Sequence, residues 1–318
     1  MAKRFPQAQI SDMATIEIPF RRDIDFDYGV AAAVTPLIRR VVARNPSPFT
    51  FKGTGTYIVG RGQVAVIDPG PEITVHIEAL LSALRGETIT HILITHTHLD
   101  HSPAAAAIKR ATGAKTYGFG PHGSGRAEDR TGVVGITEEG GDHAFVPDVV
   151  MRDGDAVEGP GWRLGAVHTP GHTSNHLCFA LREERALFSG DHVMGWSTSV
   201  IAPPDGDMAA YMRSLAKLLM RGDAVYWPTH GPSIPDPEPF VQAFIAHRRE
   251  RADAILDRLA QGDAEIPAIV AQVYVGLDPR LTGAAARSVL AHLVELVETG
   301  KVACDGPPTL DARYRLKR

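Results

Sequence analysis

The strongest constraint on this chain is a dense run of histidine and aspartate that directly follows an apolar segment. The run T-H-T-H-L-D-H, residues 95–101, contains His96, His98, Asp100 and His101. Residues 91–94 before it predict a short buried strand, and the alanine-rich segment after it predicts a helix with Ser102 as its N-cap and Gly113 at its end. The run therefore lies in a loop between a strand and a helix, where α/β folds often place their chemistry.

Three later loops offer the same kinds of side chain. Each follows a short apolar segment that predicts a strand, at residues 163–168, 186–191 and 224–230. The loops read H-T-P-G-H-T-S-N-H, S-G-D-H and P-T-H-G-P, and they contribute His172, Asp191 and His230. The chain thus presents seven candidate metal ligands at the ends of predicted strands.

The number and type of these side chains favour a pair of metal ions. In an extended segment, the alternation H-x-H puts His96 and His98 on one side, within reach of a single ion. One ion needs only three or four protein ligands, so seven fit two ions that share one carboxylate. Such ions lie roughly 3.5 Å apart, polarise a substrate and hold a hydroxide nucleophile. Imidazole and carboxylate suit zinc, with manganese or iron as alternatives.

The surrounding pattern predicts two domains. Residues 56–68 predict a hairpin with a glycine-containing turn, and residues 118–142 predict a long surface excursion. Beyond about residue 239 the pattern is mainly helical, with helices at about 239–260, after Ile266 and at about 283–299, and then a short terminal hairpin. We therefore predict a catalytic domain over residues 1–238 and a winged-helix-like domain over residues 239–318.

At this point the motifs resemble those of a known superfamily. T-H-T-H-L-D-H resembles the H-x-H-x-D-H signature of metallo-β-lactamase-fold hydrolases. H-T-P-G-H-T, F-S-G-D and T-H-G-P resemble the remaining metal motifs in the same order, and the I-D-P-G segment around Asp68 resembles the first motif. The resemblance covers about residues 53–232 and implies an α/β fold, the αββα sandwich, with two zinc ions at one edge.

The resemblance also implies a role for each candidate. His96, His98 and His172 would bind the first metal, and Asp100, His101 and His230 the second. Asp191 would bridge the two, and Asp68 would orient the ligand loop by hydrogen bonds from behind. Asp100 is in addition our candidate catalytic group, because a carboxylate beside the second metal can orient the nucleophile and accept its proton.

A narrower resemblance concerns the substrate. N-P-S-P-F-T-F-K-G-T-G-T-Y, H-T-P-G-H-T-S-N-H and H-R-R-E-R-A-D-A-I-L, together with the predicted winged helix, resemble the beta-lactamase-like protein 2 group. That resemblance implies endonuclease activity on single-stranded RNA. His176 matches a histidine of the group, which implies either support of a ligand or contact with substrate. The sequence departs from the group at Gly55 and in S-P-A-A after the metal motif.

Other functions stay open at this stage. Within the hydrolases, the substrate is a small molecule or single-stranded RNA, and the alternatives to RNA are a thioester, as in glyoxalase II, a lactone or a β-lactam. A winged helix could bind nucleic acid, although the basic run at residues 247–251 more often forms a solvated helix face. A flavodiiron-type redox protein would carry a carboxylate in place of one histidine and a fused flavin domain, and neither is seen. A homodimer is also open.

Composition sets the remaining expectations. The net charge of −4 gives no general attraction to nucleic acid or anionic membranes. Cys178 and Cys304 form no metal-type or disulfide-type pattern, which suits a reducing compartment. The first nine residues have no signal-peptide pattern, and no apolar stretch approaches the roughly 18 residues of a membrane helix. We therefore expect a cytoplasmic protein without membrane attachment.

Overall fold

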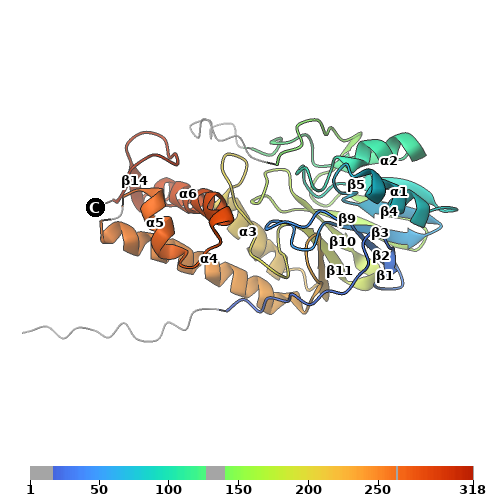
Figure 1. The fold of residues 1–318 in the computed structure, drawn as a ribbon, viewed down its shortest axis with the longest axis horizontal. Helices are drawn as coiled ribbons and strands as arrows, with labels where there is room; N and C mark the ends of the chain where they lie inside the picture. Colours follow the sequence, from blue (N-terminus) through green and yellow to red (C-terminus); the bar gives the residue numbers. More distant parts are fainter. Residues whose placement is uncertain (1–16, 127–139, 263, 318) are drawn as a thin grey trace, which may run out of the picture.

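The computed structural model describes residues 17–126, 140–262 and 264–317. Figure 1 shows an elongated molecule with the sheets at one end and the C-terminal helices at the other. The predicted surface excursion at residues 118–142 falls partly outside the described residues, and the first nine residues lie wholly outside them.

The first sheet has seven strands in the order β1-β2-β3-β4-β5-β6-β7. They are β1 (Ala32–Ala33), β2 (Ile38–Val42), β3 (Gly55–Arg61), β4 (Gln63–Ile67), β5 (Thr88–Leu93), β6 (Lys115–Gly118) and β7 (Val149–Val150). Strands β1 to β4 pair antiparallel, and β4 to β7 pair parallel. The predicted hairpin is therefore confirmed as β3 and β4, which join through Gly62 at a φ of 72°.

The second sheet has six strands in the order β13-β12-β11-β10-β9-β8. They are β8 (Ala156–Gly159), β9 (Trp162–His168), β10 (Leu177–Leu181), β11 (Ala186–Gly190), β12 (Val225–Pro228) and β13 (Ile234–Pro235), with a short 3-10 helix at Arg182–Glu184. Only β11 and β12 pair parallel.

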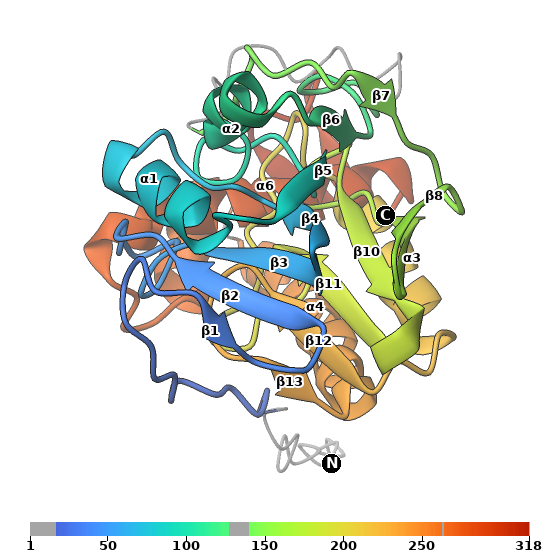
Figure 2. The same ribbon diagram turned by 90° about the vertical axis from the view of Figure 1, so that its right-hand side faces the viewer.

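The two sheets pack face to face, and helices cover both outer faces. Alternation along β3 turns Tyr57 and Val59 toward the second sheet, where they meet Phe179 and Phe188, and turns Ile58 outward. On the outside of the first sheet lie α1 (Thr74–Ala83) and α2 (Ala104–Thr112). On the outside of the second lie α3 (Met208–Leu219) and the first half of α4 (Pro237–Ala260). The predicted αββα sandwich is confirmed (Figure 2).

The C-terminal part has its own core. It contains the second half of α4, α5 (Ile266–Val273), a 3-10 helix (Pro279–Leu281), α6 (Thr282–Glu298) and the antiparallel pair β14 (Val302–Cys304) and β15 (Tyr314–Leu316). These elements confirm the predicted helices and terminal hairpin. Helix α4 serves both cores, because Phe244 packs in the sandwich and Ile255 packs in the C-terminal part. The predicted division at residue 239 lies near the start of this shared helix and stays a prediction.

The basic run at residues 247–251 is not the solvated face that its charge predicts. Arg248 is buried, lies 5.3 Å over the Tyr211 ring, and donates a hydrogen bond to the carbonyl of Ser199. Arg251 is half-buried, and only Arg249 is exposed. The prediction fails for Arg248 because α3 and α6 pack beside α4.

Among the described residues, none of the helices combines the length and the apolar character that a membrane span requires.

The packing of α4 on the second sheet generates a stability prediction. Phe244 is fully buried, and its ring centroid lies 5.4 Å from that of Phe240 and 6.3 Å from that of Phe20. We expect Phe244→Ala to lower the free energy of unfolding by about 3–5 kcal/mol, because it removes an aromatic ring and leaves a cavity. Chemical denaturation measures this change.

The matched control is Met220→Ala, because Met220 is 88 % exposed. Its free energy of unfolding should change by less than about 0.5 kcal/mol. Equal losses in the two variants would contradict the packing described for α4.

Candidate metal centre

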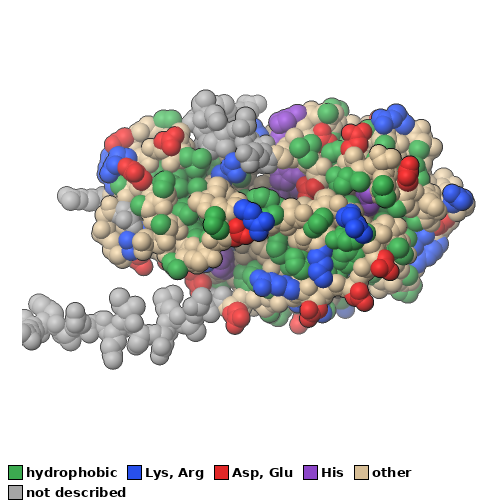
Figure 3. Space-filling view, in the orientation of Figure 1, with side chains coloured by type: hydrophobic (Ala, Val, Ile, Leu, Met, Phe, Trp, Pro, Cys, Tyr) green, Lys and Arg blue, Asp and Glu red, His purple; other side chains and the backbone are tan. Residues whose placement is uncertain are grey.

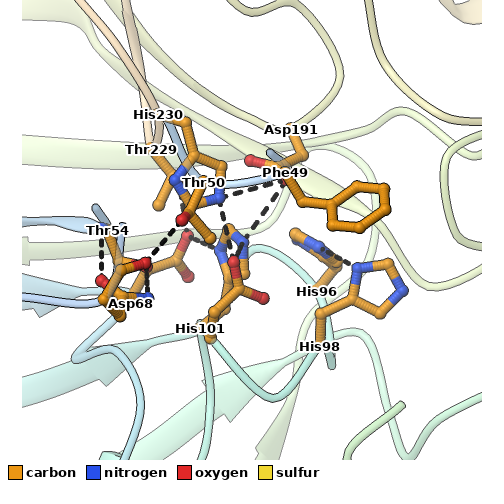
Figure 4. A network of polar contacts seen from close by, with 12 residues as sticks. Phe49, Thr50, Thr54, Asp68, His96, His98, His101, Asp191, Thr229 and His230 are labelled. Atoms are coloured by element: carbon orange, nitrogen blue, oxygen red, sulfur yellow. Dashed lines mark hydrogen bonds and ion pairs between the residues drawn. The ribbon is translucent and has the colours of Figure 1, made fainter. Parts of the chain in front are cut away.

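The predicted ligands meet at one edge of the sandwich, in loops that follow strands. His96, His98, Asp100 and His101 follow β5, His172 lies between β9 and β10, Asp191 follows β11, and His230 follows β12. Strands β4 and β5 run parallel, as do β11 and β12, so within each pair the carboxyl ends lie at the same end of their sheet. Figure 4 shows side chains from both sheets pointing toward a common centre.

The first group consists of three imidazoles. The Nδ1 atom of His98 lies 2.9 Å from Nε2 of His96 and 3.1 Å from Nε2 of His172. All three nitrogens lie within 4.8 Å of one another. Three nitrogens that converge in this way would hold one metal ion.

The second group consists of one carboxylate and two imidazoles. Oδ2 of Asp100 lies 3.0 Å from Nε2 of His230 and 3.6 Å from Nε2 of His101. The side chain of Asp100 is 27 % exposed, whereas the two histidines are buried. The carboxylate is therefore the member of this group that faces the open side.

Asp191 lies between the two groups. Its Oδ2 atom is 3.9 Å from Nε2 of His172 in the first group. In the second group, the same oxygen is 3.4 Å from Nε2 of His230 and 3.6 Å from Nε2 of His101. One carboxylate is thus within reach of both groups, as a bridging ligand has to be.

Four of the imidazoles form a hydrogen bond through Nδ1, on the side of the ring that faces away from the centre. Their partners are Thr95 Oγ1 for His96 at 3.0 Å, Asp68 for His101 at 2.9 Å, the Val200 carbonyl for His172 at 2.6 Å and the Gly53 carbonyl for His230 at 3.2 Å. Each contact lets Nδ1–H donate and leaves the lone pair on Nε2 facing the centre. This is the tautomer that a metal-binding histidine needs.

Asp68 accepts four hydrogen bonds in the interior. Its donors are the Thr95 amide at 2.8 Å, the Thr95 hydroxyl at 2.7 Å, the Thr229 hydroxyl at 3.0 Å and His101 Nδ1 at 2.9 Å. Its backbone φ is 48°, and the side chain is fully buried. Asp68 therefore joins the end of β4 to both loops that follow β5 and β12.

The electrostatics of the centre suit a cation. Burial alone would lower the pKa of His230, but the Asp191 and Asp100 carboxylates outweigh it and raise the pKa to about 10. Burial and the neighbouring His101 hold the pKa of His96 well below its usual value. Among the described residues, the buried atoms His101 Nε2 and Asp191 Oδ1 find no hydrogen-bond partner. Divalent metal ions would satisfy these atoms, so the donor set fits the predicted metals.

His176 lies behind the centre. It is fully buried, its ring stacks on His96 with centroids 5.1 Å apart, and its Nε2 accepts a hydrogen bond from the Asp191 amide at 3.3 Å. Its Nδ1 donates to Thr169 Oγ1 at 2.8 Å. Of the two roles predicted for His176, this geometry favours support of a ligand over contact with substrate.

The loop after β5 is shaped by further residues that the sequence motifs did not predict. Ser102 is not the N-cap of α2, because its hydroxyl donates to Asp142 at 2.6 Å and Pro103 occupies the cap position without a side-chain bond. Thr97 Oγ1 accepts a hydrogen bond from Asn175 Nδ2 at 2.8 Å. Thr97 and Asn175 both lie inside the histidine-containing motifs, but those motifs alone do not indicate a structural role for either residue. Asp142 lies far from Ser102 in the sequence, and no sequence motif indicated that the two side chains meet.

A cavity of about 360 Å³ opens beside the centre. His98, Asp100, His172 and Asp191 line it, together with Thr50, Gly140 and the apolar side chains of Phe49, Met194, Val200, Ala202 and Pro203. The remaining lining residues are Ala284 and Arg287, both on α6 of the C-terminal part. Figure 3 shows histidine side chains at the surface between the two parts of the molecule. The C-terminal part therefore helps to enclose the space next to the candidate metal centre.

Comparisons with known proteins agree with this architecture. Residues 50–230 match the metallo-beta-lactamase superfamily, and residues 266–307 match the beta-lactamase associated winged helix domain. A metallo-beta-lactamase family protein from Thermus thermophilus superimposes with a TM-score of 0.72 and 25 % identity, covering 90 % of this chain and 100 % of that one.

Two curated relatives are more similar in sequence. A beta-lactamase-like protein 2 homolog from Caenorhabditis elegans is 32 % identical over 83 % of this chain and 85 % of its own length. An atrochrysone carboxyl ACP thioesterase from Paecilomyces divaricatus is 32 % identical over 74 % of this chain and 69 % of its own length. From these matches and the fold, we conclude that the chain belongs to the metallo-beta-lactamase superfamily of metal-dependent hydrolases and carries the winged helix domain associated with it.

Proposed function

We propose that this enzyme hydrolyses acyl thioesters or closely related esters at a centre of two divalent metal ions. The observation that carries the proposal is the cavity beside the centre, since the described residues that line it outside the centre are mostly apolar. An apolar wall favours an acyl chain, since burial of each CH₂ contributes about 0.8 kcal/mol. The similarity to a thioesterase supports the same substrate class.

The metal ions would be held by the two groups of side chains. We assign His96, His98 and His172 to the first ion, and Asp100, His101 and His230 to the second, with Asp191 shared. We propose zinc, with manganese or iron as alternatives, because all donors are imidazole nitrogens and carboxylate oxygens. When bound, such a pair polarises a carbonyl and lowers the pKa of water.

Within this centre, we propose Asp100 as the general base that accepts the proton of the attacking water. Its carboxylate lines the cavity, and His230 Nε2 lies 3.0 Å from its Oδ2. From this position it would orient the attacking water by a hydrogen bond and accept the proton that the water releases. Asp68 and His176 would take part only indirectly, by fixing His101 and the Asp191 backbone.

The described residues near the centre offer no activated serine or cysteine for covalent catalysis. The Ser102 hydroxyl donates to Asp142, and the Ser189 hydroxyl donates to the Val193 carbonyl at 2.8 Å. Burial raises the pKa of the Cys178 thiol to about 12, so a thiolate is not available there. Direct attack by water is therefore the mechanism that we propose.

RNA is the competing substrate, but the described residues that line the cavity offer little for a phosphate backbone. Outside the metal centre, Arg287 is the one charged side chain among the described residues that line the cavity. Single-stranded RNA is usually held by a basic groove with aromatic stacking platforms. Arg248, from the basic run on α4, is buried.

A substrate screen tests this choice. We expect the metal-loaded enzyme to hydrolyse acyl thioesters of N-acetylcysteamine, with thiol release followed by a colorimetric thiol reagent. A fluorescently labelled single-stranded RNA is assayed in parallel, and Asp191→Ala serves as the inactive control for both. Cleavage of RNA by the wild type but not by the control, without thioester turnover, would replace the proposal with the endonuclease function.

Metal content tests the paired centre. The wild-type protein should hold about two ions per chain, because seven ligands exceed the need of one ion. Asp191→Ala should lose most of the metal, since one carboxylate serves both ions. Elemental analysis of the purified proteins measures this. At most one ion in folded wild-type protein that has been dialysed against excess zinc would refute the pair.

The role of Asp100 is tested by an isosteric change. Asp100→Asn should lower kcat by about 100-fold or more with a smaller change in KM, because the amide cannot accept the proton. Metal content is measured on the same preparation, so that loss of the ion is separated from loss of the base. Wild-type kcat in a metal-loaded Asn variant would contradict the assignment.

Direct attack by water has its own readout. Under single-turnover conditions in ¹⁸O-labelled water, the product of the first turnover should carry the label, as mass spectrometry would show. An unlabelled first product or a trapped acyl-enzyme would point to a covalent intermediate instead.

A further inference from the structure

We propose that Arg248 is a positioning residue for the metal centre, because it holds the backbone segment that supports His172 and Asp191. The inference rests on the paired centre of the proposed function and does not depend on the substrate. Arg248 belongs to H-R-R-E-R, the basic run on α4 to which the centre itself assigns no role. Helix α4 extends from the sandwich into the C-terminal part, so its side chains can link the two (Figure 1).

A hydrogen bond from side chain to backbone carries the proposal. The Arg248 guanidinium donates to the carbonyl of Ser199. Both residues are buried, with exposed fractions of 3 % and 1 %. A hydrogen bond from a charged donor is stronger than one between neutral groups, and removal of the donor would take this partner from a buried carbonyl. The bond therefore holds the backbone at Ser199 in place.

The backbone at Ser199 in turn reaches two candidate ligands. The carbonyl of the next residue, Val200, accepts the hydrogen bond from His172 Nδ1 at 2.6 Å. The Ser199 hydroxyl donates to the carbonyl of Asp191 at 2.6 Å and to that of His192 at 2.9 Å. A shift of this backbone would therefore move an imidazole of the first group and the bridging carboxylate.

Tyr211 on α3 gives Arg248 a second route to the same place. The guanidinium lies 5.3 Å over the Tyr211 ring, and the Tyr211 hydroxyl donates to the His192 carbonyl at 2.8 Å. A cation is attracted to an aromatic ring more strongly where both are desolvated. Contacts from α4 and α3 thus converge on the backbone beside Asp191.

Apart from the shared Asp191, the ligands of the second ion are held by other parts of the chain. His101 donates to Asp68 at 2.9 Å, and His230 donates to the Gly53 carbonyl at 3.2 Å. Neither contact involves the segment that Arg248 supports. We therefore expect a change at Arg248 to weaken binding of the first ion more than binding of the second.

Arg251 offers a matched control one turn further along α4. It is half-buried, donates to the Val273 carbonyl at 2.9 Å and lies 5.0 Å over the Tyr274 ring. The same two kinds of contact here join α4 to the end of α5. Arg251→Met therefore removes equivalent interactions from the same helix without removing a contact to the ligand segment.

A zinc titration measures the effect without any substrate. Metal-free wild type, Arg248→Met, Arg248→Lys and Arg251→Met are titrated with zinc in competition with a chromophoric chelator, and circular dichroism confirms that each is folded. Arg248→Met should weaken one of the two binding steps about 10- to 100-fold, as loss of support for a ligand usually does. Arg248→Lys keeps a charged donor and should fall between Arg248→Met and the wild type. Arg251→Met should bind zinc as the wild type does.

A double variant assigns the weakened step. His96→Ala removes a ligand of the first group, so the remaining strong step should belong to the second ion. Adding Arg248→Met to His96→Ala should change this step little, because two changes that act on one ion are not additive. Equal weakening of both steps, an equal loss in Arg251→Met, or wild-type affinity in Arg248→Met would overturn the proposal. If Arg248→Met does not fold, Arg248→Lys decides: weaker binding at the same step supports the proposal, and wild-type affinity overturns it.

The outcomes also separate this inference from the proposed function. Weaker zinc binding in Arg248→Met, without thioester turnover by the wild type, would remove the thioesterase function and leave the positioning role. Two ions and thioester turnover in the wild type, with unchanged zinc binding in Arg248→Met, would remove the positioning role alone. A wild type that binds fewer than two ions would overturn the paired centre and this inference together.

Discussion

The buried carboxylate of Asp68 is the contact on which the site depends. It ends β4 and accepts hydrogen bonds from the loop after β5, through Thr95 and His101, and from the loop after β12, through Thr229. One side chain thus ties the ligand loops of both sheets to the same point. A buried carboxylate with fewer donors would lower the stability of the fold. The hydrogen bond from His101 is one of those that satisfy Asp68, and it also fixes the orientation of the His101 ring.

Other candidate ligands are also oriented by hydrogen bonds to neighbouring protein groups. Backbone carbonyls of Val200 and Gly53 accept hydrogen bonds from His172 and His230, and the Asp191 amide donates to His176. Hydrogen bonds within the protein therefore fix the orientation of these ligands. Arg248 extends the support outward, because it joins α4 to the Ser199 carbonyl next to Val200. The Ser199 hydroxyl in turn donates to the carbonyls of Asp191 and His192, so one short segment supports several ligands.

Much of this arrangement could be predicted from the sequence, because each short motif contains both the end of a strand and one or more candidate ligands. Strand alternation and helical spacing predicted the hairpin at β3 and β4 and the helices α4 to α6. What failed depended on tertiary packing. Ser102 has the sequence context of a cap but donates to Asp142, and Arg248 has the context of a solvated face but is enclosed by neighbouring helices. The contribution of Arg287 to the cavity could not be predicted, because it depends on how the C-terminal part sits against the sandwich.

The central claim is that two groups of ligands with one shared carboxylate hold two ions. A crystal of the zinc-loaded protein, measured with X-rays at the zinc absorption edge, tests it most directly. We predict two anomalous peaks roughly 3.5 Å apart, with Asp191 between them. One peak should lie against His96, His98 and His172, and the other against Asp100, His101 and His230. A single peak at full occupancy, or peaks away from these side chains, would contradict the account.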